Sequence, residues 1–354
     1  MEKVYYDVFP YDDGSEDFVK MLLLQNQYAI NDIYIPKTWK STHNQVDEFD
    51  SLNFVKGVPP YAAKNDLIIV PSRSNINEQF LDNFIQSALE RGRKVINLRN
   101  IKNTQAYADN PRFINYANRT TFFNEYKTSP VFNDDNPKII SAPIICIGSV
   151  IEGCGELLLQ YKVKRILEAQ GNKVLWIGSS SISEFFSAYG NLSNLYFDCN
   201  DFSKVIAKIN HCINRALIET NSDILLVGAP KGVIALNDCI VNDYGVFFYL
   251  LSNAINIDYM ITLLPNDEKI NEVDIHELNS IMYYRFGIKN AYWWITDKKP
   301  YYYFIDTTQK FTLSKCRTDL CSNNPLDVSV YKHFEKQALE RLLQSIENQT
   351  NTII

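Results

Sequence analysis

The sequence predicts an α/β protein with two Rossmann-like, doubly wound domains whose sheets are mostly parallel, plus a C-terminal α+β extension. Short apolar runs alternate with amphipathic stretches of helical length, a pattern that favours parallel strands joined by right-handed crossovers. The chain has 354 residues, enough for two domains, and 46% of them are hydrophobic, enough for buried cores. The alternation changes near residue 271, where we expect the extension to begin.

The first predicted domain covers residues 1–105. Its strands are predicted at 4–8, 28–35, 66–70 and 94–98, and its helices at 17–24 and 77–91. The second helix should bury one apolar face formed by Phe80, Phe84, Ile85 and Leu89. Residues 106–137 are predicted to connect the two domains.

The second predicted domain covers residues 138–270 and begins with the clearest unit of the chain. A buried strand at 139–147, a glycine turn, an amphipathic helix at 157–170 and a strand at 173–177 form a βαβ unit. We expect a long helix capped near residue 201, a strand at 223–227, a helix at 244–254 and a strand at 259–264 to follow. The extension, residues 271–354, should contain a helix at 275–286, paired edge strands at 291–295 and 301–305, and a terminal helix at 328–345.

Charge and composition narrow the classes of partner. The net charge of −6 argues against a broad phosphate-binding surface, so no nucleic acid partner is expected. No apolar run is long enough to span a membrane, and the N-terminus lacks the layout of a signal peptide, so a cytoplasmic location without membrane contact is expected. The seven cysteines are scattered, and neither they nor the four histidines show the spacing of a metal site, so none is predicted.

The turn at the end of the strand at 139–147 is the main candidate for a ligand site. Backbone N–H groups and the helix dipole converge at such a turn in open α/β sheets. Gly148 and Gly153 have the spacing of the phosphate-binding motif G-x-x-x-x-G-K-[ST], but Cys154 and Gly155 replace its lysine and hydroxyl residue. Two glutamates would also repel a polyphosphate, so the loop is a degraded one. The candidate residues are Gly148, Ser149, Glu152, Gly153, Cys154, Gly155 and Glu156.

Three interpretations of this turn stay open: it only packs, it binds a triphosphate, or it binds another ligand at the helix N-terminus. The dinucleotide motif G-x-G-x-x-G is not matched, and no acidic residue follows the next strand, which excludes a nicotinamide-dependent dehydrogenase. Cys154 lies near a helix N-terminus, where a thiol can be reactive. No Ser/His/Asp array can be recognised from spacing, and no catalytic residue is assigned.

A second loop follows the strand at 223–227. If the sheet is parallel, this loop and the central turn face the same crevice, and Lys231 could supply the positive charge that the turn lacks. The alternative is a proline-glycine turn that only closes a buried strand. The candidate residues are Gly228, Pro230, Lys231, Gly232 and Asn237.

Several segments together resemble a known family. They are FPYD at 9–12, GNKVLWIGS at 171–179 and SDILLVGAPKGVIALND at 222–238, with Gln160 and Asn210 between them. The chain resembles a clostridial protein family of peptide maturation systems, whose genes accompany a radical SAM maturase and a cysteine-rich, bacteriocin-like precursor peptide. The chain departs from the family at Glu156, where the family has a lysine, and at Lys231, where the family has a glycine. Both departures weaken a nucleotide-binding role.

The resemblance implies an accessory protein in the maturation of a ribosomally synthesised, modified peptide. Its partners would be the precursor peptide, the radical SAM maturase, or both, and no cofactor is expected. Aromatic residues at 292–304 on the predicted edge strands could pair with a peptide strand, or they could face a core or a homodimer partner. The alternative function is an enzyme with a nucleotide or small-anion site in the crevice at 148–156 and 228–232. A third hypothesis is a structural homodimer without a ligand.

Overall fold

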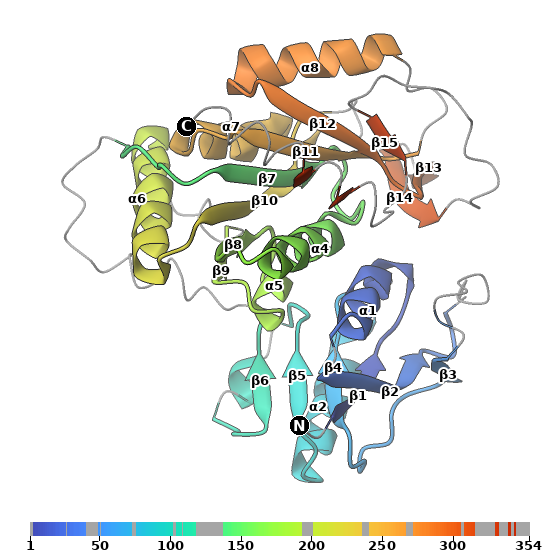
Figure 1. The fold of residues 1–354 in the computed structure, drawn as a ribbon. Helices are drawn as coiled ribbons and strands as arrows, with labels where there is room; N and C mark the ends of the chain where they lie inside the picture. Colours follow the sequence, from blue (N-terminus) through green and yellow to red (C-terminus); the bar gives the residue numbers. More distant parts are fainter. Residues whose placement is uncertain are drawn as a thin grey trace. The chain divides into compact units, whose positions relative to one another are not determined.

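The computed structural model describes residues 3–25, 27–39, 49, 51–72, 76–101, 104–107, 109–117, 137–192, 201–235, 241–266, 272–305, 308–315, 330–332, 339–340 and 343–344. The chain divides into two compact units, Met1–Arg119 and Thr120–Ile354, called here the N-terminal unit and the C-terminal unit. Each is an α/β unit with an all-parallel main sheet (Figure 1), which confirms the predicted fold class.

The N-terminal unit contains a six-stranded sheet in the order β3-β2-β1-β4-β5-β6. The order reverses at β1, so the topological switch point lies between β1 and β4. Right-handed crossovers on either side of this point place helices on opposite faces of the sheet. The strands are β1 (Val4–Phe9), β2 (Tyr28–Ile35), β3 (Asn53–Lys56), β4 (Asp66–Ile69), β5 (Val95–Asn97) and β6 (Phe113–Asn115). The helices are η1 (Asp13–Ser15), α1 (Glu16–Leu23), α2 (Glu78–Glu90) and η4 (Thr104–Tyr107).

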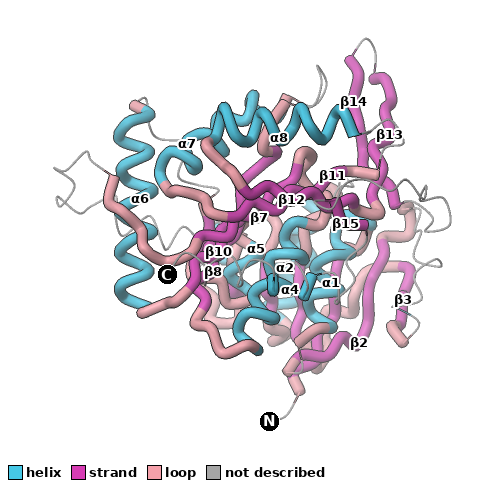
Figure 2. The backbone as a smooth tube through the Cα atoms, turned by 45° about the horizontal axis from the view of Figure 1, so that its top comes forward, coloured by secondary structure: helices cyan, strands magenta, loops and turns pink. Residues whose placement is uncertain are grey.

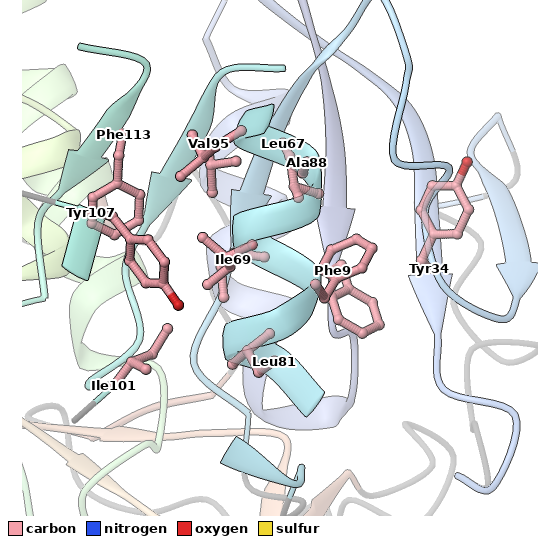
Figure 3. Packing of buried hydrophobic residues seen from close by; sticks show 13 residues of the cluster. Phe9, Tyr34, Leu67, Ile69, Leu81, Ala88, Val95, Ile101, Tyr107 and Phe113 are labelled. Atoms are coloured by element: carbon pink, nitrogen blue, oxygen red, sulfur yellow. The ribbon is translucent and has the colours of Figure 1, made fainter. Parts of the chain in front are cut away.

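Helix α2 covers one face of this sheet and forms the core shown in Figure 3. It begins at Glu78 because the Asn77 side chain accepts a hydrogen bond from Phe80 N at 2.9 Å. Its buried face contains Leu81, Phe84 and Ile85. Phe80, which we expected on this face, is 40% exposed, because the helix is rotated so that Leu81 points into the core instead.

The C-terminal unit contains a seven-stranded sheet in the order β15-β12-β11-β7-β10-β8-β9. Figure 2 shows α6, α7 and α8 on one side of this sheet and α4 on the other. A separate antiparallel hairpin joins β13 (Lys298–Ile305) to β14 (Thr308–Lys315). The other strands are β7 (Ile144–Ser149), β8 (Val174–Gly178), β9 (Gly190–Asn191), β10 (Ile224–Gly232), β11 (Tyr259–Leu264), β12 (Asn290–Ile295) and β15 (Val330–Lys332). The helices are α4 (Glu156–Ala169), α5 (Ile182–Phe185), α6 (Phe202–Thr220), η5 (Asn242–Gly245), α7 (Val246–Ala254) and α8 (Glu272–Phe286).

The structure corrects the predicted pairing of the extension. Strand β12 does not pair with β13 at a sheet edge; it lies between β11 and β15 in the main sheet, parallel to both. Trp293 and Trp294 are fully buried there, so they offer no surface for a peptide strand. A strand buried on both faces is apolar without alternation, which is why its sequence resembles that of an aromatic edge strand.

Two further expectations differ from the structure. Residues 330–332 form β15, so a helix does not begin at residue 328. Residues 113–115 form β6, the outer strand of the first sheet, within the stretch predicted to be a connection. Three-residue strands are too short to show a period in the sequence, and pairing with a neighbouring strand defines them.

No helix among the described residues combines the length and the apolar character needed to cross a membrane.

Candidate functional site

The central turn of the C-terminal unit connects β7 to α4, and two kinds of glycine shape it. Gly153 and Gly155 have φ angles of +85° and +103°, in the left-handed region that side chains rarely adopt. Gly148 is needed for a different reason: a Cβ atom there would lie 2.7 Å from Val233 Cγ1 and 2.8 Å from Ala229 Cβ. The strand can therefore approach β10 closely, and the chain can turn sharply into the helix.

The carboxylate of Glu156 fills the anion position of this turn. Its Oε1 atom accepts a hydrogen bond from Gly153 N at 3.0 Å, and its own backbone N–H also stabilises the carboxylate. Its Oε2 atom is buried and has no hydrogen-bond partner among the described residues. Burial raises the pKa of Glu156, and the charge of Glu152 adds to that rise, while the backbone hydrogen bonds and Lys298 oppose it. The amides that would hold a phosphate therefore already hold a carboxyl group of the chain itself.

Lys298 completes this arrangement, and we did not predict it. It is the first residue of β13, is only 8% exposed, and donates a hydrogen bond from Nζ to Gly153 O at 3.0 Å. The sequence Lys298-Lys299-Pro300 resembles an exposed turn, because two adjacent lysines before a proline are common on protein surfaces. The buried Thr296, whose hydroxyl accepts a hydrogen bond from Lys298 N at 3.3 Å, is a weak signal that the chain is not exposed here.

Two other predicted residues of the turn are also buried. Ser149 is fully buried, and its hydroxyl has no partner among the described residues. Cys154 is fully buried too, so the thiol that we considered as reactive does not face solvent. Glu152, by contrast, is exposed.

The predicted second loop is part of a strand. Residues 228–232 continue β10, with an irregularity in its pairing to β7 between Gly228 and Gly232. Pro230 is buried within it. A Cβ atom at Gly228 would overlap Gln160 Oε1, and Gln160 accepts a hydrogen bond from Trp176 Nε1 at 3.2 Å. These residues therefore pack the sheet against α4.

The structure brings the second segment next to the central turn but directs Lys231 elsewhere. Gly232 is in register with Ser149, so the two segments are neighbours in the sheet. The Lys231 ammonium pairs with Asp243 and lies 4.2 Å from the centroid of the Phe247 ring. It is therefore directed toward the start of α7, whereas the Lys298 ammonium is bonded to the turn. Asn237 lies outside the described residues.

Asn242 ties the two segments together. Its Nδ2 atom donates hydrogen bonds to Val150 O at 2.6 Å and to Ile234 O at 2.5 Å. Asn242, Asp243 and Tyr244 all have positive φ angles, between 49° and 54°. Left-handed conformations of this kind persist only where surrounding contacts hold them. The hydrogen bonds of Asn242 therefore hold the backbone at the sheet edge next to the central turn.

The N-terminal unit has its own hollow at the carboxyl ends of β1, β2 and β3. A pocket of about 340 Å³ opens there, beside the start of α2. Lys37 and Asn77 are among its polar lining residues. Its apolar lining includes Phe9, Pro36, Trp39, Val58, Ile76 and Phe80.

The first turn of this unit, between β1 and η1, is closed by Asp12. Asp12 Oδ1 accepts a hydrogen bond from Gly14 N at 2.9 Å, and Ser15 Oγ accepts one from Asp12 N at 3.0 Å. This capping box satisfies amides to which a dinucleotide phosphate would otherwise bind.

The described part of the chain gathers no group of three or more His, Cys, Asp or Glu side chains that could hold a metal ion.

Comparison with known proteins supports the architecture. No protein-family model matches the chain, and no curated protein matches it. The crystal structure of a DUF1611 family protein from Anabaena variabilis, at 2.30 Å resolution, is similar with a TM-score of 0.53 and 11% sequence identity. The similarity covers 83% of this chain and 88% of that one. At this identity the similarity shows the fold alone.

Proposed function

We propose that this protein is a non-catalytic accessory protein in the maturation of a ribosomally synthesised, bacteriocin-like peptide. It binds the precursor peptide through the pocket of the N-terminal unit, and the radical SAM maturase is its second partner. The family resemblance supplies the biological context. The observation that carries the proposal is the central turn, whose amide donors are occupied by Glu156.

The occupied turn argues against a nucleotide. A polyphosphate would have to displace the Glu156 carboxylate from Gly153 N and would also face the exposed charge of Glu152. The residues that bind the γ-phosphate and magnesium in a phosphate-binding loop are replaced by buried Cys154 and Gly155. The residues of the central turn therefore favour a peptide-binding site in another part of the molecule.

The pocket of the N-terminal unit suits an apolar side chain of a peptide. Its volume of about 340 Å³ lies within the range of roughly 300–1,000 Å³ typical of small-ligand pockets. Phe80 and Val58 are 40% and 42% exposed, so apolar surface is accessible at its lining. β3 is the outer strand of the sheet beside the pocket, and an extended peptide can pair with such a strand while one side chain enters the pocket.

The test is fluorescence anisotropy with a labelled cysteine-rich precursor peptide of the kind that accompanies the family the chain resembles. Phe80→Asp and Val58→Asp should each weaken binding by about tenfold or more, since a buried charge opposes an apolar contact. Phe202→Asp is the matched control, because Phe202 is 58% exposed on the C-terminal unit. Unchanged affinity in both pocket variants would reject the pocket, and the absence of any binding would reject the function.

The alternative function is an enzyme with a nucleotide or small-anion site at 148–156 and 228–232. One observation favours it: Ser149 Oγ and Glu156 Oε2 are buried beside the turn without a partner among the described residues. A thermal-shift series with ATP and GTP, with and without magnesium, separates the two functions. A ligand at a hundred times its Kd stabilises the folded state by about 2.7 kcal/mol. A shift that Lys298→Met or Lys231→Ala removes would support the enzyme, whereas no shift would support the accessory protein.

A further inference from the structure

A second feature of the N-terminal unit lies at the carboxyl end of β5, where Arg99 is held by its neighbours. The fully buried Asn97 donates a hydrogen bond from Nδ2 to Arg99 O at 2.8 Å, and Asn97 Oδ1 accepts one from Arg99 N at 3.2 Å. These two bonds fix the backbone of Arg99. Its guanidinium then reaches the neighbouring strand end and donates from Nη1 to Ser72 Oγ.

This position is next to the topological switch point of the sheet. Ser72 follows β4, and Arg99 follows β5, the next strand in the sheet. Figure 3 shows the same edge, where Leu81 at the start of α2 and Ile101 after β5 lie at one end of the core. Ligands of doubly wound sheets bind outside the carboxyl ends of the strands at this point.

The guanidinium carries a charge that no carboxylate of the described residues neutralises by direct contact. Arg99 forms its side-chain hydrogen bond with Ser72, although a guanidinium has five N–H donors. Partial burial lowers the pKa of Arg99, and the charges of Asp12 and Glu78 act in the opposite direction. A partly desolvated cation with unused donors is a binding group for an anion.

We propose that Arg99 and Ser72 bind a carboxylate group beside the switch point of the N-terminal sheet, at the carboxyl ends of β4 and β5. The guanidinium offers two parallel N–H donors, which match the two oxygens of a carboxylate. Neither residue lines the pocket that contains Phe80 and Val58, and the proposal does not depend on the proposed function.

Two observations favour a carboxylate over a phosphate. The amides of the turn after β1, which bind the pyrophosphate in dinucleotide-binding domains, are occupied by the capping box of Asp12 and Ser15. Asp12 and Glu78 also place negative charge near Arg99, which opposes a doubly charged phosphate more strongly than a singly charged carboxylate. A free organic acid and the C-terminus of a peptide share this chemistry.

The experiment measures binding to the full chain by isothermal titration calorimetry at constant ionic strength. The probes are acetate, tri-alanine, tri-alanine with an amidated C-terminus, and inorganic phosphate. We expect acetate, tri-alanine or both to bind, and the amide not to bind. Binding to Arg99→Met should be weaker by about tenfold or more, as expected for a lost charge-assisted hydrogen-bond pair.

Two further variants make the result specific. Arg112→Met is the matched control, since Arg112 is an exposed arginine of the same unit, and it should bind like the wild type. Arg99→Lys keeps the charge but loses the paired donors, so it should bind more weakly than the wild type even if Arg99→Met does not fold. Acetate binding alone would identify an organic acid as the ligand class, and tri-alanine binding alone would identify a peptide C-terminus. Equal binding by wild type and Arg99→Lys, binding of phosphate alone, or no binding of any probe would overturn the proposal.

Discussion

In the N-terminal unit the turn after β1 directs the N–H of Gly14 to the carboxylate of Asp12, and in the C-terminal unit the turn after β7 directs the N–H of Gly153 to the carboxylate of Glu156. Both turns occupy the place where Rossmann-like folds bind phosphate. In both, an acidic side chain of the protein takes the place of the ligand. The two acids differ in their position along the chain and in their exposure to water.

Asp12 precedes the helical segment and is half-buried, and its turn contains no left-handed glycine. Glu156 is the first residue of α4, and its carboxylate is buried in a turn with two left-handed glycines and the ammonium of Lys298. Water can therefore stabilise the charge of Asp12, whereas burial disfavours the charged form of Glu156, and only protein groups oppose that effect. An acidic side chain that accepts a hydrogen bond from a turn N–H therefore has a low desolvation cost at the surface and a high one in the interior.

The largest expected loss of stability follows from breaking the buried ion pair of the N-terminal unit. Arg93 and Asp7 are 2% and 1% exposed and form an ion pair, and Arg93 also donates to Asn65 O at 3.0 Å and Pro60 O at 2.7 Å. Arg93→Met leaves Asp7 charged and buried, so the free energy of unfolding of this unit should fall by about 3–5 kcal/mol. Hydrogen exchange of the β1 and β4 amides measures the loss locally.

Arg112→Met, at an exposed arginine of the same unit, is the control for this prediction and should change stability by less than about 0.5 kcal/mol. The double variant Asp7→Leu, Arg93→Met should recover part of the loss, because it removes the unpaired charge. A single variant as stable as the wild type would show that the pair does not hold this sheet together.

The next largest loss of stability is expected for a substitution of Lys298 in the C-terminal unit. Lys298→Met removes the donor to Gly153 O and a nearby positive charge from Glu156. We expect a loss of about 1–3 kcal/mol, the range for leaving a buried polar group unsatisfied. Chemical denaturation measures it, with Lys204→Met as the control, because the Lys204 side chain is 69% exposed. A loss no greater than in the control would mean that water can replace Lys298, and the turn would then resemble the exposed turn of Asp12.

Much of the fold could be predicted from the sequence, because strands buried on both faces leave strong signals. The runs around β4, β7 and β10 are apolar, and the helices between them keep a helical period. The position of β12 could not be predicted, because an aromatic strand inside a sheet and an aromatic edge strand have similar sequences. Strand β10 extends through Gly228 and Gly232 because close packing, rather than a turn, requires those glycines.

The candidate site was predicted only in part. The spacing of Gly148 and Gly153 indicated the turn, and the replacement of the motif lysine indicated that the turn is altered. The role of Glu156 as an internal ligand depends on its side-chain conformation, which spacing does not define. Lys298 comes from a strand more than 140 residues further along the chain, so only the tertiary fold brings it to the turn.

The third prediction uses the pKa of Glu156, which burial raises. As the pH rises above the ordinary glutamate value of about 4.5, the unfolded chain loses this proton before the folded chain does. The wild type therefore loses stability with rising pH relative to Glu156→Gln, by at most about 1.4 kcal/mol per pH unit. Denaturation between pH 4 and pH 7, about the range in which carboxyl groups titrate, measures this difference. Glu277→Gln, at an exposed glutamate of α8, is the control, and parallel profiles for wild type and Glu156→Gln would contradict the raised pKa of Glu156.

The smallest effect is expected at Asp12, whose turn is accessible to water. Asp12→Ala removes the acceptor for Gly14 N, and the typical loss for such a cap is about 1 kcal/mol. Asp12→Asn keeps an acceptor of similar strength, so its stability should lie within a few tenths of a kcal/mol of the wild type. Denaturation measures both variants, and faster hydrogen exchange at Gly14 in Asp12→Ala alone would assign the loss to this cap. A loss of several kcal/mol in either variant would show that Asp12 does more than cap the turn. The contrast between a water-accessible acidic side chain and a buried one would then no longer explain why the two turns are built differently.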